Sequence, residues 1–238
     1  MERLALRTLW SECFGNEDDW IETFLGTAFD SVHVCTLNRQ GLPAAALCWM
    51  DVFCDGRKLA YLYAIATAPD YRHQGLCREL MGLTHERLTE QGYAGAILVP
   101  AGGGLRQMYA KMGYVNFGGI REISAQAGTP VLVRRISPEE YAALRRVYLP
   151  AGGVIQENGA IEYLSAGAAL YAGQDFLLAM SGDFGLELLG NPEAAPGILG
   201  ALGLKNGTFR VPGENPFAMY RSLTKDGWIP GYFGLAFE

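Results

Sequence analysis

The chain has 238 residues, which is enough for one large domain or two domains of ordinary size. Half of the residues are hydrophobic and 18% are charged, so the composition supplies a core and excludes an intrinsically disordered chain. The net charge of −6 disfavours a nucleic-acid partner, because binding to a phosphate backbone needs clustered Lys and Arg.

The first part of the chain alternates between helix and strand patterns. Four segments have the apolar repeat of three to four residues that is typical of amphipathic helices: 2–14, 17–29, 74–91 and 105–112. Five segments have strand patterns: 31–38, 44–53, 59–67, 96–99 and 114–123. Turn residues at Gln40-Gly41 and Asp55-Gly56 separate the first three strands, which predicts an antiparallel meander.

The composition changes at 124–130, because three prolines precede Pro130 and eight lie from Pro130 onward. We therefore predict a boundary between a domain at 1–126 and a second domain at 127–238. The second domain is expected to contain a strand, three helices and a hairpin that turns at Gly182-Asp183, in the ranges 131–136, 137–148, 155–169, 176–189 and 192–202. A turn at Asn206-Gly207 and two strands around Asp226-Gly227 are predicted to finish the chain.

Cysteine and histidine usage indicates a chain without disulfides or a metal. The five cysteines all lie in the first third and form no C-x-x-C pair, which is typical of free thiols in a reducing cytosol. The three histidines lack a partner at metal-ligand spacing, so we expect no metal site. No apolar run reaches the roughly 18 residues of a membrane span. We therefore predict a cytoplasmic protein with no membrane partner.

A strand, a short loop and a helix that begins at a glycine follow one another between residues 59 and 91. The unpaired N–H groups and the dipole of a helix start form an anion site. Gly75 lacks the side chain that would keep a diphosphate from the backbone, and Arg72 can brace the loop or reach a phosphate. An isolated R-x-x-G is unspecific, however, since Gly75 can equally be a helix-start glycine and Arg72 a surface charge.

Two motifs resemble the GCN5-related N-acetyltransferase (GNAT) family. Arg72-His73-Gln74-Gly75-Leu76-Cys77, after Ala68-Pro69-Asp70-Tyr71, is similar to the family's R/Q-x-x-G-x-G/A loop, with Cys77 where the family has Gly or Ala. Tyr109 to Tyr114 is similar to its Tyr-x-x-x-Gly-Phe/Tyr helix. The resemblance covers about the first 123 residues. It implies an α/β (α+β) fold, in which helices flank a central mixed and mostly antiparallel sheet.

The segment 131–141 resembles the opening strand and helix of another such domain, but no R-x-x-G-x-G/A follows it. The resemblance therefore implies a tandem arrangement. The second domain would be a GNAT-like α/β domain that lacks the CoA loop, walls the acceptor cleft and donates a strand to the first.

The resemblance also implies that acetyl-CoA binds between two splayed strands and leaves as coenzyme A. The implied cofactor-binding residues are Ile65, Ala66, Thr67, Arg72, His73, Gln74, Gly75, Leu76, Cys77 and Arg78. An N–H at Ile65 or Ala66 would stabilise the oxyanion, and Tyr109 would protonate the leaving thiolate. Alternatively, Tyr109 is a core tyrosine of an amphipathic helix. His85 is more typical of a surface residue, or of a residue whose hydrogen bonds are satisfied, than of a general base.

The implied reaction is direct attack of a primary amine on the thioester, and the acidic balance favours a small cationic amine as acceptor. The general base stays open, and its candidates are Asp51, Tyr61, Tyr63 and the carboxylate of Glu238. The alternative function is a non-catalytic acyl-CoA-binding sensor or interaction module. We expect a small-molecule amine as the partner and leave a homodimer open.

Overall fold

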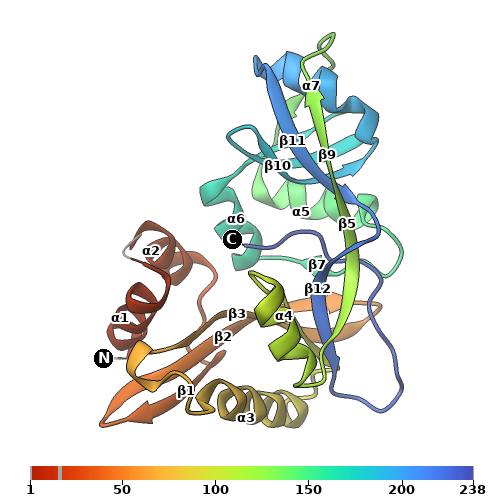
Figure 1. Ribbon diagram of the computed structural model, residues 1–238. Coiled ribbons are helices and arrows are strands. Elements are labelled where there is room, and N and C mark those ends of the chain that lie inside the picture. Colours follow the sequence, from red (N-terminus) through yellow and green to blue (C-terminus); the bar gives the residue numbers. More distant parts are fainter. Residues whose placement is uncertain (1, 16–17, 238) are drawn as a thin grey trace.

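The computed structural model describes residues 2–15 and 18–237, and in these ranges the strands form one mixed sheet flanked by helices (Figure 1). This is the predicted fold class. The elements of the first half are α1 (Glu2–Phe14), α2 (Asp18–Thr27), β1 (Val34–Arg39), β2 (Leu42–Cys54), β3 (Arg57–Thr67), η1 (Pro69–Tyr71), α3 (Leu76–Glu90), β4 (Gly95–Leu98), α4 (Gly103–Ala110) and β5 (Val115–Gln126).

The second half adds short strands and three further helices to the described part of the chain. Its elements are β6 (Arg134–Arg135), α5 (Pro138–Tyr148), β7 (Ile155–Gln156), α6 (Gly159–Gly167), β8 (Ala169–Ala172), β9 (Phe176–Ser181), β10 (Phe184–Gly190), η2 (Pro192–Ala194), α7 (Ala195–Leu202), β11 (Asn206–Pro212) and β12 (Asn215–Ser222). Ser137 caps α5 as its type predicts, because its side chain accepts a hydrogen bond from the Glu140 N–H.

The two halves share one sheet through β5 and β12. The strand order is β1-β2-β3-β4-β12-β5-β11-β10-β9-β8-β6, and β7 pairs with β2. β5 runs along both halves in Figure 1, and it pairs with β12 over 115–120 and with β11 over 120–126. β12 lies between β4 and β5, which confirms the expectation that the second half donates a strand. The boundary at 126/127 itself stays a prediction.

The order of elements in the first half recurs in the second. Two helices, a three-stranded antiparallel meander, a helix and a parallel strand make up α1-α2-β1-β2-β3-α3-β4 and again α5-α6-β8-β9-β10-α7-β11. The first turn of α7, the helix that follows the second meander, is covered by the preceding chain. Gly128 and Val131 donate backbone hydrogen bonds to the carbonyls of Pro196 and Gly197. This covered start differs from the exposed loop before α3.

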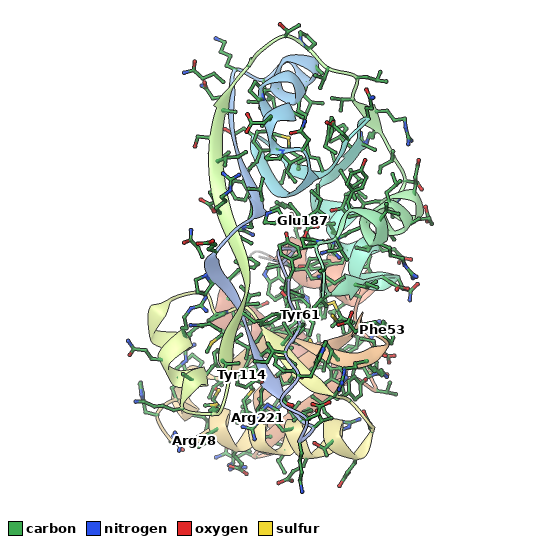
Figure 2. The ribbon with its side chains drawn as sticks, turned by 90° about the vertical axis from the view of Figure 1, so that its right-hand side faces the viewer. Phe53, Tyr61, Arg78, Tyr114, Glu187 and Arg221 are labelled. Atoms are coloured by element: carbon green, nitrogen blue, oxygen red, sulfur yellow. The ribbon has the colours of Figure 1, made fainter. Side chains whose placement is uncertain are left out.

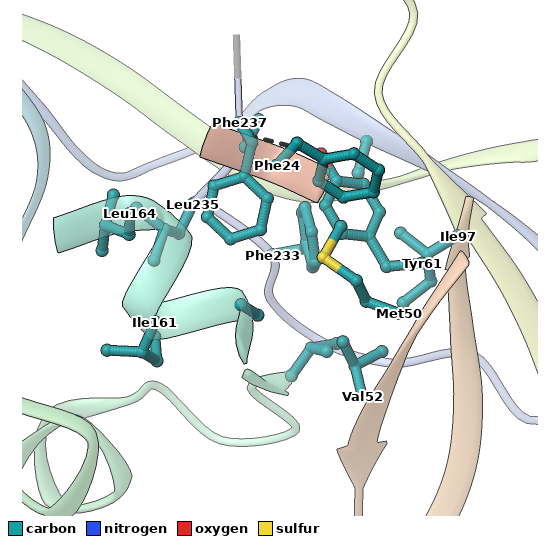
Figure 3. Close-up of a cluster of buried hydrophobic side chains, with 14 of the residues drawn as sticks. Phe24, Met50, Val52, Tyr61, Ile97, Ile161, Leu164, Phe233, Leu235 and Phe237 are labelled. Atoms are coloured by element: carbon teal, nitrogen blue, oxygen red, sulfur yellow. Dashed lines mark hydrogen bonds between the residues drawn. The ribbon is translucent and has the colours of Figure 1, made fainter. Parts of the chain in front are cut away.

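The segment 228–237 crosses from the second half to the centre of the molecule. Figure 3 shows Phe233 and Phe237 against Tyr61 of β3, and Leu235 near α6. All three of these segment residues are buried. Burying a large apolar side chain stabilises a fold by roughly 1.5–3 kcal/mol. The segment is therefore a packed part of the core, although it forms none of the strands.

A buried ion pair anchors this segment to α5 and β10. Arg145 of α5 donates from Nε and Nη2 to the two carboxylate oxygens of Glu187, at 2.6 and 3.0 Å. Tyr232 donates its hydroxyl to the same carboxylate at 3.1 Å, and Arg145 also donates to the Val154 carbonyl. Figure 2 places Glu187 in the upper half, above Tyr61. Because every charge has partners, the pair can be buried without an uncompensated charge.

Four predicted elements differ from the structure. The helix expected over 155–169 begins only at Gly159, because 155–156 pairs with the edge of β2 as β7. The strand expected over 131–136 shrinks to β6, and β8 is additional. The last two strands are β11 and β12, so Asn206-Gly207 opens a strand instead of forming a turn. Asp226-Gly227 lies in an exposed loop, where Thr224 and Arg57 donate hydrogen bonds to the Asp226 carboxylate.

Candidate active site

A cavity of about 650 Å³ opens where β3 and β4 separate. The two strands pair in parallel only over 59–61 and 95–97, so the sheet is split beyond these residues. The cavity is lined by Phe14, Trp20, Tyr61, Leu62, Tyr63, Ala64, Ile65, Leu98, Val99, Pro100, Ala101, Leu105, Arg106, Tyr109, Phe217, Ala236 and Phe237. The split between parallel strands thus provides a channel into the sheet.

A β-bulge in β3 lies at the wall of this cavity. Ala64 and Ile65 together oppose Leu47 of β2, and Ala64 has a φ of +49°. The Trp10 indole donates to the Ala64 carbonyl at 3.1 Å and so holds the bulge from α1. Such positive φ in a residue with a side chain costs free energy and persists only where the surroundings enforce it.

The pairing of β3 decides which predicted backbone groups reach the cavity. Ala66 pairs with Ala46, so its backbone groups face β2. The Thr67 carbonyl accepts hydrogen bonds from Arg72 Nε at 3.1 Å and from the Cys13 thiol at 3.3 Å. Of the three strand residues predicted to bind the cofactor, Ile65 is the one that lines the cavity.

The predicted anion loop, residues 72–78, is an exposed turn that leads into α3. His73 and Gly75 have φ values of +62° and +82°, and Gly75 is the N-cap. The Glu79 N–H bonds to the Gly75 carbonyl at the start of the helix, so the N–H groups of 76–78 lack an acceptor within the helix. We call residues 72–78 the cradle. Arg72 braces the cradle against β3, which is one of its two predicted roles.

Tyr109 of α4 lies at the wall of the cavity with 5% of its surface exposed. Burial raises the pKa of its hydroxyl, so Tyr109 keeps its proton at neutral pH. Its ring packs edge-on against Tyr114 at a centroid distance of 5.9 Å. The side chain is thus a core residue that also lines the cavity and keeps its proton.

Neither Cys77 nor His85 has the properties of a nucleophile or a general base at this cavity. Burial raises the pKa of the Cys77 thiol, which therefore stays protonated and is a poor nucleophile. His85 Nε2 lies 2.8 Å from the Tyr114 hydroxyl, and burial lowers the pKa of His85 to about 4. His85 does not line the cavity, which agrees with a satisfied buried residue.

The candidate general bases are dispersed. Tyr61 and Tyr63 line the cavity, where Tyr63 shares a 2.9 Å hydrogen bond with Tyr163. Asp51 pairs with Ala60 further along the sheet, does not line the cavity, and accepts hydrogen bonds from Tyr93 and Lys58. The structure thus separates Asp51 from the predicted site. Glu238 lies outside the described residues.

Several lining residues were not predicted. Phe14 and Trp20 appear in the sequence only as apolar positions of amphipathic helices, and Phe217 and Phe237 are distant from both motifs. Arg106 donates to the Asn116 side chain at 2.6 Å and to the Phe217 carbonyl at 3.0 Å. Only the folding of α1, α2, β12 and 228–237 around the split sheet brings these residues together.

Residues 5–116 match the family model of the acetyltransferase (GNAT) domain. Residues 5–116 are a GNAT domain. The family transfers acyl groups from acyl-CoA, and the chain is accordingly an acyltransferase. The two motifs, the split between β3 and β4, and the cradle all fall within or next to this GNAT domain. No curated protein sequence matches the chain.

Solved structures extend the GNAT likeness over the second half. GCN5-related N-acetyltransferases from Kribbella flavida and Anabaena variabilis superpose with TM-scores of 0.65 and 0.66 at 20% and 14% identity. Each covers 92% of this chain, which in turn covers 68% and 70% of theirs. Eis1 from Mycobacterium abscessus gives a TM-score of 0.66 at 12% identity. The superposition covers 93% of this chain and 71% of the Eis1 chain. These values show a shared fold.

No described helix has the length and apolar character needed to cross a bilayer. No group of three His, Cys, Asp or Glu side chains within residues 2–15 and 18–237 is arranged to hold a metal ion.

Proposed function

We propose that this chain transfers the acetyl group of acetyl-CoA to the primary amine of a small molecule that is cationic in solution. The observation that carries the proposal is the cavity at the split of β3 and β4, with the Ala64–Ile65 bulge and Tyr109 at its wall and the cradle after the end of β3. Splayed strands beside a phosphate-binding helix start suit a long thioester that ends in a diphosphate.

The residues present fit acetyl-CoA. A Cβ on Gly75 would meet no atom within 4 Å, so the space beside this residue is open to a ligand. The backbone of Ile65 would bind the pantetheine arm, and the N–H groups of Gly75 to Arg78 would bind the diphosphate. When bound, acetyl-CoA supplies an electrophilic acetyl carbon in a thioester.

The side chains and backbone of the cavity have separate tasks. The Ile65 N–H at the bulge would stabilise the negative charge on the attacked carbonyl oxygen, a contribution of about 3 kcal/mol for one such donor. The Tyr109 hydroxyl carries the proton for the leaving sulfur. Burial and Tyr163 raise the pKa of the Tyr63 hydroxyl, so Tyr63 orients the amine by hydrogen bonding and does not take its proton.

The test is thiol release from acetyl-CoA across a panel of amines, with Tyr109→Phe compared with Tyr114→Phe. Tyr114 neighbours Tyr109 but does not line the cavity, so it is the matched control. We expect Tyr109→Phe to lower kcat by about 100-fold or more, and Tyr114→Phe to change it little. Full activity of Tyr109→Phe would remove the acid role.

Calorimetric titration with acetyl-CoA distinguishes the alternative. Tight binding without turnover on any amine would favour an acyl-CoA sensor, whereas absence of binding would exclude both functions. We also propose that the second half is a GNAT-like unit that walls the acceptor side, which the repeated element order and the lining residues Ala236 and Phe237 support. A homodimer stays a prediction, to be checked by light scattering.

A further inference from the structure

The segment 228–237 reaches the cavity without forming a helix or one of the strands. Its residues Ala236 and Phe237 line the cavity, and the Phe237 N–H donates to the Tyr61 hydroxyl at 3.4 Å (Figure 3). Helices and strands hold their residues by repeated backbone hydrogen bonds, whereas an irregular segment depends on individual contacts. The contacts that fix this segment therefore determine where Ala236 and Phe237 lie.

Tyr232 fixes the segment through both its backbone and its side chain. Its N–H donates to the Gly152 carbonyl at 3.1 Å, and its carbonyl accepts a hydrogen bond from the Val154 N–H at 2.9 Å. The Tyr232 hydroxyl, which is buried, donates to Glu187 Oε1 at 3.1 Å. Because Arg145 binds both oxygens of Glu187, the hydroxyl is bonded to a carboxylate whose position is fixed.

The chain passes closely over this hydrogen bond at Gly234. A Cβ on Gly234 would collide with the Tyr232 hydroxyl and would lie 3.2 Å from Glu187 Oε1. Only a glycine leaves room for the backbone to pass the Tyr232–Glu187 bond. The position of the Tyr232 hydroxyl is thus coupled to the path of the residues that lead to the cavity.

A second contact holds the segment directly before the cavity. Gln156 of β7 is 1% exposed, and its Nε2 donates to the Leu235 carbonyl at 2.9 Å. This carbonyl belongs to the peptide that joins Leu235 to Ala236, so the bond orients the first lining residue. Gln156 Oε1 is buried without a hydrogen-bond partner among the described residues, which costs free energy. Core stability therefore does not explain this amide, whereas its bond to the segment does.

Resting on the proposed function, we infer that Tyr232 and Gln156 are positioning residues for the acceptor amine. They hold residues 236–237 at the cavity through hydrogen bonds to Glu187 and to the Leu235 carbonyl, and neither side chain lines the cavity itself. Residues 236–237 bound the space for the acceptor in the proposed function. Loosening the segment therefore weakens the binding of the amine and leaves the cradle for acetyl-CoA intact.

The first test compares two tyrosines that donate to the same carboxylate. Tyr141 of α5 also donates to Glu187, at 3.4 Å, and is fully buried, but it lies outside the segment. We expect Tyr232→Phe to raise the KM for the amine with the highest turnover by about 5-fold or more, because small displacements of positioning groups are costly. The KM for acetyl-CoA should stay unchanged, and Tyr141→Phe should change neither KM. Equal effects of the two variants on the amine KM would overturn the inference.

The second test separates positioning from stability. Gln156→Met preserves the approximate size of the side chain and removes both the donor to Leu235 and the unpaired oxygen. Because one unpaired buried group replaces another, we expect the urea midpoint to stay close to that of the unmodified chain. The KM for the amine should nevertheless rise by about 5-fold. A lower midpoint with an unchanged amine KM would assign Gln156 a purely structural role and contradict the inference.

Hydrogen exchange of the full-length chain distinguishes failure of this inference from failure of the proposed function. In peptides that cover 231–237, we expect Tyr232→Phe and Gln156→Met to speed amide exchange by about 3-fold or more, and Tyr141→Phe to change it little. Faster exchange in a chain that acetylates no amine would refute acetyl transfer but support the hold on the segment. Acetyl transfer with unchanged exchange in both variants would support the proposed function and overturn the inference.

Discussion

His85 and Tyr109 lie on α3 and α4, are both buried, and respond to burial in opposite directions. Desolvation disfavours the charged form, so it lowers the pKa of His85 to about 4 and raises the pKa of Tyr109. Both groups are therefore neutral at pH 7. For Tyr109 this keeps a transferable proton at the cavity. For His85 it removes a charge from the core.

The titration of His85 predicts a pH dependence of stability. Between pH 4 and 6.5 the unfolded chain binds a proton that folded His85 does not, so the free energy of unfolding falls as the pH falls through this window. The loss is on the order of 3 kcal/mol. We expect His85→Gln to flatten this slope in urea titrations at pH 4.5, 5.5, 6.5 and 7.5. His73→Gln, on the exposed loop, is the control, and equal slopes for both variants would contradict the assignment.

A glycine flanks each end of the helix α3, and the two glycines have different roles. Gly75 begins the helix and Gly92 follows its end, with φ values of +82° and +77°. A Cβ would meet no atom within 4 Å at either position. The two glycines therefore have the same conformational reason to be glycine, but only Gly75 stands in the cradle.

This pair allows backbone strain to be separated from ligand binding. Gly75→Ala and Gly92→Ala should each lower the free energy of unfolding by about 1–2 kcal/mol, because both force an alanine into the left-handed region. Only Gly75→Ala should also raise the KM for acetyl-CoA, by about 10-fold or more. Steady-state kinetics and urea unfolding of both variants give the two readouts. A similar KM in both variants would argue against diphosphate binding at the cradle.

At the scale of the whole molecule, β5 and β12 make the halves interdependent. β12 pairs with β4 on one side and with β5 on the other, although it comes from the second half. Where the turn between β11 and β12 meets β5, a Cβ on Gly119 would collide with the Gly213 carbonyl oxygen, so these two segments approach each other at glycines. The segment 228–237 adds a second connection, through the Tyr232–Glu187 hydrogen bond.

We therefore expect residues 1–126 alone to be insoluble or loosely packed. Without β12, the facing edges of β4 and β5 would be unpaired, and unpaired edges promote aggregation. The full chain should unfold in one cooperative urea transition, with the same midpoint by near-UV and far-UV circular dichroism. Coexpression with 127–238 is the control for rescue. A soluble 1–126 fragment with native near-UV dichroism would show that the first half folds alone.

Local sequence patterns specify some elements of this chain better than others. Strong local patterns predicted α1, the meander and α5, because apolar periodicity, turn residues and caps are properties of neighbouring residues. The end of the chain was harder to predict. β12 and β7 are strands because distant strands offer them partners, and pairing partners leave no mark in local periodicity.

The same division holds for the site. The sequence alone determined the cradle and the Tyr109 helix, since each is a contiguous motif whose chemistry depends on residues a few positions apart. Only the tertiary structure decided that Ile65 instead of Ala66 faces the cavity, that Asp51 lies elsewhere, and that Phe14, Trp20, Phe217 and Phe237 meet as the acceptor wall. These decisions depend on strand register and on contacts between residues far apart in the sequence, such as Tyr61 and Phe237, which packing against a shared sheet establishes.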